Sequence, residues 1–272
     1  KSNSPGVFAG STSILSSHAS PFRLQRIASP RIVHVHFFTS SWLEPNPSNV
    51  ILYSCSWKCP NDSSCDAEYV GDIWPFPTPQ AKRIEVYYSL AGGSKGLSHW
   101  WFTGGWPSMG LRPDAEGAPL WKEMGLLGNE IKTARNLIVT SHPVDLALTP
   151  SQNVWARAVA SGTDSVILYV VNDDYYNDFT GCHYNQVSNA TVTASLPAWM
   201  VPPTAFEVTP AGLRDVNTQR NDDQLQVNLG TLQLTKMIVL TKNAQVLNAS
   251  QYWSVYISAT QHCVRHASEW SC

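Results

Sequence analysis

After Pro150 the apolar residues of the chain gather in short runs that are rich in β-branched side chains. Asn, Asp, Gly and Pro separate these runs, and no helical stripe interrupts them. This pattern is typical of an antiparallel β-sandwich, which we predict over residues 150–242. The expected strands are Val154–Val159, Ser165–Val171, Thr191–Leu196, Ala205–Val208, Gln224–Leu229 and Lys236–Leu240.

Two segments ahead of this region have the periodicity of helices. The first is expected to begin after Thr78, a suitable N-cap, with Pro79 in its first turn, and to end at the glycine pair 92–93. The second is expected to open at Pro119. Between them, residues 95–102 are predicted to form a short strand that leads into a Gly- and Pro-rich loop. The second helix has apolar residues at intervals of three and four, namely Leu120, Met124, Leu127, Ile131, Ala134 and Ile138.

Helix, strand, loop and helix in this order are typical of an α/β unit, which we expect over residues 68–148. Residues 1–67 are rich in Ser and Pro and have no sustained period, although 32–38 and 50–53 are predicted strands. A Pro-containing linker is expected near 141–151, and residues 243–272 are an aperiodic tail. The predicted fold class is therefore α/β followed by all-β.

Composition and charge narrow the classes of partner. Charged residues make up 14% of the chain against roughly 25% in a typical domain, and the net charge is −2. We therefore expect neither nucleic acid nor a membrane surface as a partner. No apolar run approaches the ~20 residues that span a bilayer. The chain begins without Met or a signal-peptide pattern, and a mature chain or a fragment is the expectation.

The six cysteines are compatible with disulfide bonds in an oxidising compartment, although the sequence leaves their pairing open. An extracellular or periplasmic location follows as an expectation. Cys55, Cys59 and Cys65 lie close together but lack a matching downstream Cys or His pair, so no metal site is predicted. No phosphate loop or dinucleotide fingerprint occurs, and no cofactor is expected.

One segment combines glycines with aromatic residues, Gly92-Gly-Ser-Lys-Gly-Leu-Ser-His-Trp-Trp101, and Trp106 follows just beyond it. Flat tryptophan faces suit the apolar face of a sugar ring, and His99 could hydrogen-bond a sugar hydroxyl. Trp100, Trp101 and Trp106 are therefore candidate substrate-binding residues. With eleven Trp and ten Tyr in the chain, packing in an ordinary aromatic core is the alternative for each of them.

Residues 69–241 resemble the C-terminal part of a TIM-barrel glycoside hydrolase with its appended β-sandwich. Trp74-Pro-Phe-Pro-Thr-Pro-Gln80 and the run that ends at Trp101 are similar to the last barrel helix and strand. Leu120-Trp-Lys-Glu-Met-Gly-Leu-Leu-Gly-Asn-Glu130 is similar to the closing helix. Val154-Trp-Ala-Arg-Ala158 and Val166-Ile-Leu-Tyr-Val-Val-Asn172 are similar to the start of the sandwich.

The resemblance implies a partial (β/α) barrel end followed by an antiparallel β-sandwich. It also implies an oligo- or polysaccharide partner and hydrolysis of a glycosidic bond by two carboxyl groups. In such enzymes the substrate lies at the C-terminal ends of the barrel strands. Trp100 or Trp101 would therefore form the floor of the subsite beside the scissile bond. Which glycan is bound, and whether hydrolysis would be retaining or inverting, stay open.

The catalytic carboxylates are harder to find. A full barrel needs about 250 residues, and only about 90 precede the expected last strand. Asp66, Glu68 and Asp72 lie near the expected end of the preceding strand, and Glu68 fits best by position. Glu68 and Asp72 are the candidate catalytic residues. The simpler interpretation of Glu68 is a solvated loop carboxylate. Glu85, Glu123 and Glu130 lie on the predicted helices and are interpreted as surface or salt-bridge groups.

Three functional alternatives stay open: an active glycoside hydrolase, a non-catalytic glycan-binding or truncated relative, and a structural β-rich secreted protein. A partial barrel would also leave unpaired edges beside its last strand. Either residues 1–67 supply replacement strands through 32–38 and 50–53, which we prefer, or the protein self-associates. The oligomeric state is otherwise undetermined.

Overall fold

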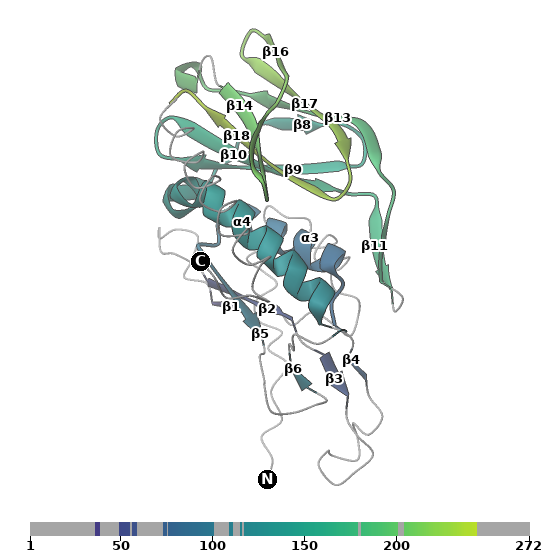
Figure 1. Ribbon diagram of the computed structural model, residues 1–272. Helices are drawn as coiled ribbons and strands as arrows, with labels where there is room; N and C mark the ends of the chain where they lie inside the picture. Colours follow the sequence, from purple (N-terminus) through teal and green to yellow (C-terminus); the bar gives the residue numbers. More distant parts are fainter. Residues whose placement is uncertain are drawn as a thin grey trace, which may run out of the picture.

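The computed structural model describes residues 36–38, 49–54, 56–58, 73–74, 76–100, 109–110, 115, 117–178, 181–200 and 204–243. In these residues the chain forms mostly antiparallel β-sheets, with two α-helices. Figure 1 shows the helices lying between the large β-structure that follows them in the sequence and a small sheet from the amino-terminal part.

The helices are α3 (Pro79–Ala91) and α4 (Ala118–Thr140). The strands before α4 are β1 (His36–Phe38), β2 (Asn49–Tyr53), β3 (Ser56–Lys58), β4 (Ile73–Trp74), β5 (Gly96–Trp100) and β6 (Met109–Gly110). The strands after α4 are β7 (Ser141–Pro143), β8 (Leu148–Pro150), β9 (Val154–Ser161), β10 (Ser165–Asn172), β11 (Tyr175–Asp178), β12 (Gly181–Tyr184), β13 (Val187–Ser195), β14 (Thr204–Thr209), β15 (Gly212–Asp215), β16 (Thr218–Asn221), β17 (Gln224–Leu232) and β18 (Thr235–Thr241).

Two antiparallel sheets make up the carboxyl-terminal part. One has the strand order β15-β14-β18-β10-β9-β7, and the other has the order β16-β17-β13-β8. The six strands expected from the short β-rich runs are all present, which confirms a β-rich region. The segment 141–151 differs from its prediction as a linker, because β7 and β8 lie within it and join one sheet each. Both are short strands, and β7 contains a Pro, which weakens the sequence signal for a strand.

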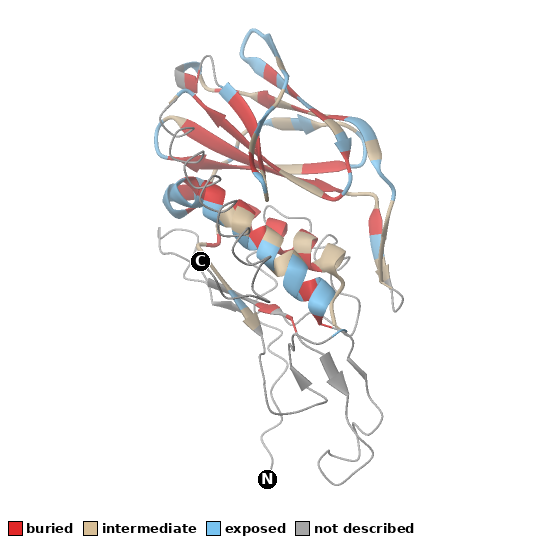
Figure 2. Cartoon of the chain, viewed as in Figure 1, coloured by how far each residue is buried: buried red, intermediate tan, exposed pale blue. Residues whose placement is uncertain are grey.

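Strand β10 explains why one run of the sequence is apolar without alternation. Every residue of β10 is buried. Ile167, Tyr169 and Val171 pack in the core against the helices, while the intervening residues pack in the core between the two sheets. Since both faces of this central strand are covered, both sets of alternate residues must be apolar. Figure 2 shows that the central strands of the larger sheet are almost entirely buried and that the neighbouring helices are buried in part.

The helices form where the sequence predicts them. The side chain of Thr78 accepts a hydrogen bond from the Ala81 backbone N–H at 3.1 Å, and Pro79 occupies the first turn of α3. Helix α4 begins one residue before the predicted Pro119. Four of its six stripe residues are buried, namely Leu120, Leu127, Ala134 and Ile138. The predicted stripe is therefore the face that packs against the rest of the protein.

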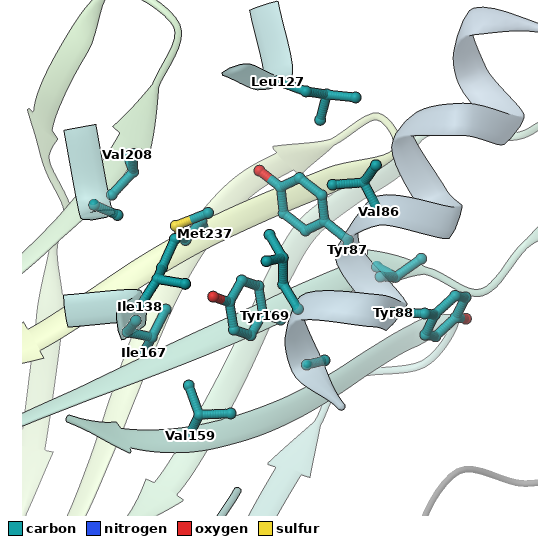
Figure 3. Close-up of a cluster of buried hydrophobic side chains, with 14 of the residues drawn as sticks. Val86, Tyr87, Tyr88, Leu127, Ile138, Val159, Ile167, Tyr169, Val208 and Met237 are labelled. Atoms are coloured by element: carbon teal, nitrogen blue, oxygen red, sulfur yellow. The ribbon is translucent and has the colours of Figure 1, made fainter. Parts of the chain in front are cut away.

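The core between the helices and the larger sheet is mostly aliphatic, and aromatic rings from the helices pack into it (Figure 3). The Tyr87 ring of α3 meets the Tyr169 ring of β10 edge-on, with centroids 6.0 Å apart. Tyr88 meets Trp155 of β9 in the same manner at 4.6 Å. Edge-to-face pairs of this kind add about 0.5–1.5 kcal/mol each beyond their buried area. Much of the aromatic content of the described residues therefore serves packing.

Strands β2 and β5 are parallel neighbours, and β1 pairs antiparallel with β2. The preferred prediction that residues 1–67 supply strands beside the last strand is confirmed by these pairings. Helix α3 connects β2 to β5, as a crossover between parallel strands requires. In the described residues this is the one parallel pair. The structure thus shows a β-α-β-α unit, and the barrel end remains a proposal.

The turn between α3 and β5 depends on a glycine. Gly93 has φ +89, and a Cβ added there would lie 2.8 Å from two ring carbons of Pro143 in β7. We expect Gly93→Ala to lower the free energy of unfolding by about 2 kcal/mol, because both the backbone and the contact become strained. Gly128→Ala is the matched control on α4. An added Cβ meets nothing within 4 Å there, so we expect a gain of about 0.5–1 kcal/mol. Urea unfolding followed by circular dichroism measures both, and equal losses would contradict the assignment.

Candidate functional site

The carboxyl ends of β2 and β5 lie side by side. Their register pairs Leu52 with His99 and Tyr53 with Trp100, so both strands end at the same level. Ser54 follows β2 directly, and the aromatic run of the sequence leaves the end of β5. Parallel α/β units bind their ligands at the carboxyl ends of the strands. This edge is therefore the candidate functional site.

His99 lies on the helix-facing side of β5. Leu97, two residues earlier on the same face, packs against the core with the helices, whereas Ser98 on the opposite face is exposed. The His99 ring nitrogen Nδ1 is 2.9 Å from the hydroxyl oxygen of Ser54, which is fully buried. His99 is thus partly buried, and Ser54 is its hydrogen-bond partner at the strand ends.

Burial and the nearby charge of Lys82 lower the pKa of His99 to about 4. The imidazole is therefore neutral at physiological pH. A neutral imidazole has one donor and one acceptor nitrogen, and Ser54 occupies Nδ1. A contact with a sugar hydroxyl would have to use the other nitrogen, Nε2. The predicted sugar-binding role of His99 stays a prediction.

A buried ion pair lies in the first turns of α3, close to His99. Lys82 Nζ is 2.5 Å from Glu85 Oε2, and the two side chains are 0% and 7% exposed. The second oxygen of Glu85 is buried and has no hydrogen-bond partner in the described part of the chain. Burial raises the pKa of Glu85, although Lys82 opposes this shift. Glu85, interpreted from the sequence as a surface or salt-bridge group, is a buried member of a salt bridge.

A second ionic cluster joins the two helices. The Arg83 guanidinium contacts Glu123 Oε1 at 2.5 Å and both oxygens of Glu130 at 2.9 and 3.1 Å. Tyr87 donates a hydrogen bond to Glu130 at 2.8 Å. Burial alone would lower the pKa of Arg83, but the charges of Glu130, Tyr87 and Glu123 outweigh it and raise the pKa. The salt-bridge interpretation of both glutamates is confirmed, and Glu130 is buried as well.

Lys95 of the glycine-rich run has a structural role. Its ammonium group donates hydrogen bonds to the carbonyl of Ile138 at 2.6 Å, to the Ser141 hydroxyl at 2.7 Å and to the Ser141 carbonyl. These acceptors lie at the carboxyl end of α4, where helix carbonyls lack partners and a cation is favourable. Burial lowers the pKa of Lys95 to about 8. Lys95 thus fastens the start of β5 to the end of α4.

The other predicted site residues are only partly placed. Glu68, Asp72, Trp101 and Trp106 lie outside the described residues, and Trp100 is described as the last residue of β5 by its backbone. The strand beside β5 ends at Tyr53, and β3 lies between this strand end and Glu68 in the sequence. The catalytic and sugar-stacking roles of these five residues therefore stay predictions.

Sequence reasoning missed Ser54, Lys82 and Arg83. Ser54 and His99 are 45 residues apart, and nothing local marks them as partners. Lys82 and Glu85 have the spacing of a helical surface pair, and the sequence does not show that β2 and β5 cover them. The helix sequence offers no local signal of their burial, because Gln80 and Arg83 on the same helix give it the pattern of a solvated surface.

The described residues contain no group of three or more His, Cys, Asp or Glu side chains that could hold a metal ion. None of the described helices combines the length and apolarity that a membrane span needs. Cys182 is a free thiol, and burial raises its pKa to about 11. The other cysteines lie outside the described residues, and their pairing stays open.

No protein-family model and no curated protein matches the chain. Among solved structures the similarity is to glycoside-hydrolase and glucanotransferase structures, and it is weak and partial. A cycloisomaltooligosaccharide glucanotransferase from Paenibacillus sp., in complex with cycloisomaltoheptaose, aligns with a TM-score of 0.43 and 12% identity over 64% of this chain and 30% of that enzyme. Alpha-L-fucosidase isoenzyme 2 from Paenibacillus thiaminolyticus aligns with a TM-score of 0.27 and 10% identity over 35% of this chain and 15% of that enzyme. The chain thus spans less than a third of either enzyme, and these values leave its family unassigned.

Proposed function

We propose that this protein is carbohydrate-active and binds an oligo- or polysaccharide at the carboxyl ends of β2 and β5. One observation carries the proposal: the strands end side by side, and the Trp-rich run continues directly from β5. A ligand edge of a parallel unit followed by aromatic residues suits stacking on sugar rings. The β-α-β-α unit with a β-sandwich packed on its helices further supports a glycoside-hydrolase-type barrel end.

Glycan binding is the part of this function that the geometry supports best. The residue that directly follows β2 is Ser54, and the nearby carboxylate Glu85 is buried against Lys82. Hydrolysis would need two carboxyl groups at about 5–5.5 Å or about 6.5–9.5 Å from each other. In our proposal Glu68 and Asp72 are the candidates if the protein is active, and a non-catalytic glycan-binding protein is the alternative. A secreted location belongs to the same proposal.

Binding can be tested with the purified chain and linear hexasaccharides of glucose, mannose, xylose and N-acetylglucosamine, measured by isothermal titration calorimetry. We expect Trp101→Ala to weaken binding about tenfold or more, because it removes a stacking surface. Trp121→Ala is the matched control, since Trp121 lies on α4 and is 37% exposed. Binding that survives Trp101→Ala unchanged would remove the strand-end site from the proposal.

Catalysis has its own test, namely release of reducing sugar from the glycan that binds best. We expect Glu68→Gln and Asp72→Asn each to abolish release while glycan binding persists, because each change removes a proton-transfer group and conserves the shape. Release that is unchanged in both variants would exclude these carboxylates. Binding without any release would establish the non-catalytic alternative.

A further inference from the structure

The hairpin of β11 and β12 is a small two-stranded sheet that extends from the sandwich alongside α3 (Figure 1). Its register pairs Tyr175 with Tyr184 and Tyr176 with His183. Alternate residues of a strand point to opposite faces, so the members of each pair share a face. The hairpin thus has two chemically different faces.

The inner face anchors the hairpin to the protein. Tyr175 is 4% exposed, and Tyr184 and Cys182 pack against the core that includes α3. The hairpin also approaches the amino end of α3, since a Cβ added at Gly181 would lie 3.4 Å from a side-chain carbon of Thr78. This packing fixes the orientation of the outer face.

The base of the hairpin is held by Asn172, which is fully buried. Its side-chain amide donates to the carbonyls of Asn185 and Gln233 at 2.6 Å each. Its side-chain oxygen accepts a hydrogen bond from the Asp174 backbone N–H at 2.8 Å. Both ends of the hairpin are therefore fixed, one where it follows β10 of the larger sheet and the other where it precedes β13 of the second sheet, and the outer face is preorganised.

The outer face presents two stacked rings. Tyr176 and His183 lie with centroids 4.8 Å apart and ring planes at 19°, and Tyr176 is 59% exposed. Beside them, Asp174 Oδ2 accepts hydrogen bonds from Asn185 at 3.3 Å and from Asn153 at 3.4 Å. These distances are at the long end for hydrogen bonds, so the carboxylate and amide groups can readily exchange them for ligand hydroxyls. The four outer residues and the two inner residues Cys182 and Tyr184 line one shallow hollow.

We propose that the outer face of this hairpin, formed by Asp174, Tyr176, His183 and Asn185, is a second saccharide-binding site. The Tyr176 ring would stack on the apolar face of one sugar unit, and Asp174 and Asn185 would hydrogen-bond its hydroxyls. The choice of a saccharide, rather than another flat polar ligand, rests on the proposed function.

The size of the face favours a sugar segment over a protein partner. Each strand has four residues and is about 13 Å long. A stable protein interface covers about 800 Å² of each partner, which is far more than one side of such a hairpin offers. A single exposed aromatic residue needs no explanation. A ring stack beside a loosely bonded carboxylate–amide pair, on a rigid support, has the components of a small polar site.

The test uses the whole chain and the same hexasaccharide panel. Ring ¹H–¹³C resonances of the histidines are followed during titration, and His183→Gln identifies the resonance of His183. We expect this resonance to shift with a bound saccharide and Tyr176→Ala to weaken that binding about tenfold. Tyr176→Phe keeps the ring and is expected to retain the shift. Thermal unfolding of each variant checks that the fold is intact.

The results of these experiments distinguish the hairpin site from the strand-end site. If Trp101→Ala abolishes binding while Tyr176→Ala does not and the His183 resonance stays still, the hairpin proposal is overturned and the proposed function stands. If Tyr176→Ala abolishes binding while Trp101→Ala has no effect, the hairpin site is supported and the strand-end site is wrong. If no saccharide of the panel binds the wild-type chain at millimolar concentration, both proposals are overturned.

Discussion

Replacing Arg83 by leucine is expected to lower the free energy of unfolding by about 3–5 kcal/mol. Arg83 lies between Glu123 and Glu130, and the Arg83, Glu123 and Glu130 side chains are 16%, 15% and 3% exposed. Without the guanidinium, Glu130 would be a buried carboxylate whose remaining described partner is Tyr87. A charge left unpaired in the interior costs much more than its ion pair contributed. Urea unfolding at neutral pH, followed by far-ultraviolet circular dichroism, measures the change.

Arg214→Leu is the matched control for this prediction. Arg214 also forms an ion pair, with Glu207, but its side chain is 62% exposed. An exposed pair contributes about 0–1 kcal/mol, because water and salt screen it. Equal losses in the two variants would contradict the view that burial makes the Arg83 cluster important. A loss under about 1 kcal/mol for Arg83→Leu would show that α3 and α4 are held together by apolar packing alone.

Lowering the pH from 7 to 4.5 is expected to destabilise the wild-type chain relative to His99→Gln by about 2–3 kcal/mol. The folded state keeps the pKa of His99 at about 4, whereas the ordinary value is 6.5. Between these values the unfolded chain takes up a proton that the folded chain does not. Stability from the neutral imidazole is therefore present above pH 6.5 and is lost as the pH falls toward 4. Glutamine does not titrate, so its variant lacks this contribution.

Denaturant titrations at pH 7, 6, 5 and 4.5 on both proteins give this difference directly. Comparing the two chains cancels the opposite contribution of Glu85, whose pKa is raised by burial. Ser54→Ala is the control, because it removes the hydrogen-bond partner of His99 and leaves the titrating ring. It should lower stability at every pH and keep the pH dependence. If the free energies of unfolding of the wild type and His99→Gln changed in parallel with pH, His99 would not be held neutral in the folded state.

The hairpin and the parallel strand ends belong to one end of the α/β unit. Helix α3 runs back between β2 and β5, so its amino end lies toward the carboxyl ends of the strands. The charge of Lys82 in the first turn of α3 reaches His99 near the end of β5, in agreement with this direction. Gly181 of the hairpin lies against Thr78 at the same end of α3. The two proposed saccharide sites would therefore lie at the same end of α3.

Local sequence patterns were sufficient for the two helices and for six strands of the sandwich, but not for the short strands β7, β8, β11, β12, β15 and β16. Thr78 and Pro79 define the start of α3, and the apolar stripe of α4 defines its packed face. These six strands follow from β-rich runs and turn residues, because both depend on neighbours a few positions apart. The predicted pairing of residues 50–53 with the strand before Trp101 followed from a physical requirement, namely that a strand edge needs a partner.

The tertiary structure alone decided which polar residues are buried together. The sequence shows Lys82, Arg83 and Glu85 as three charged residues on one helix, a pattern that fits a solvated surface. Covering by β2, β5, α4 and the larger sheet turns them into two buried ionic clusters, because contacts between distant segments remove the water. The same holds for His99, whose partner Ser54 is 45 residues away. Local pattern thus determined helices, strands and the aromatic run, while long-range packing determined the charges, the pKa of His99 and the exposed face of the hairpin.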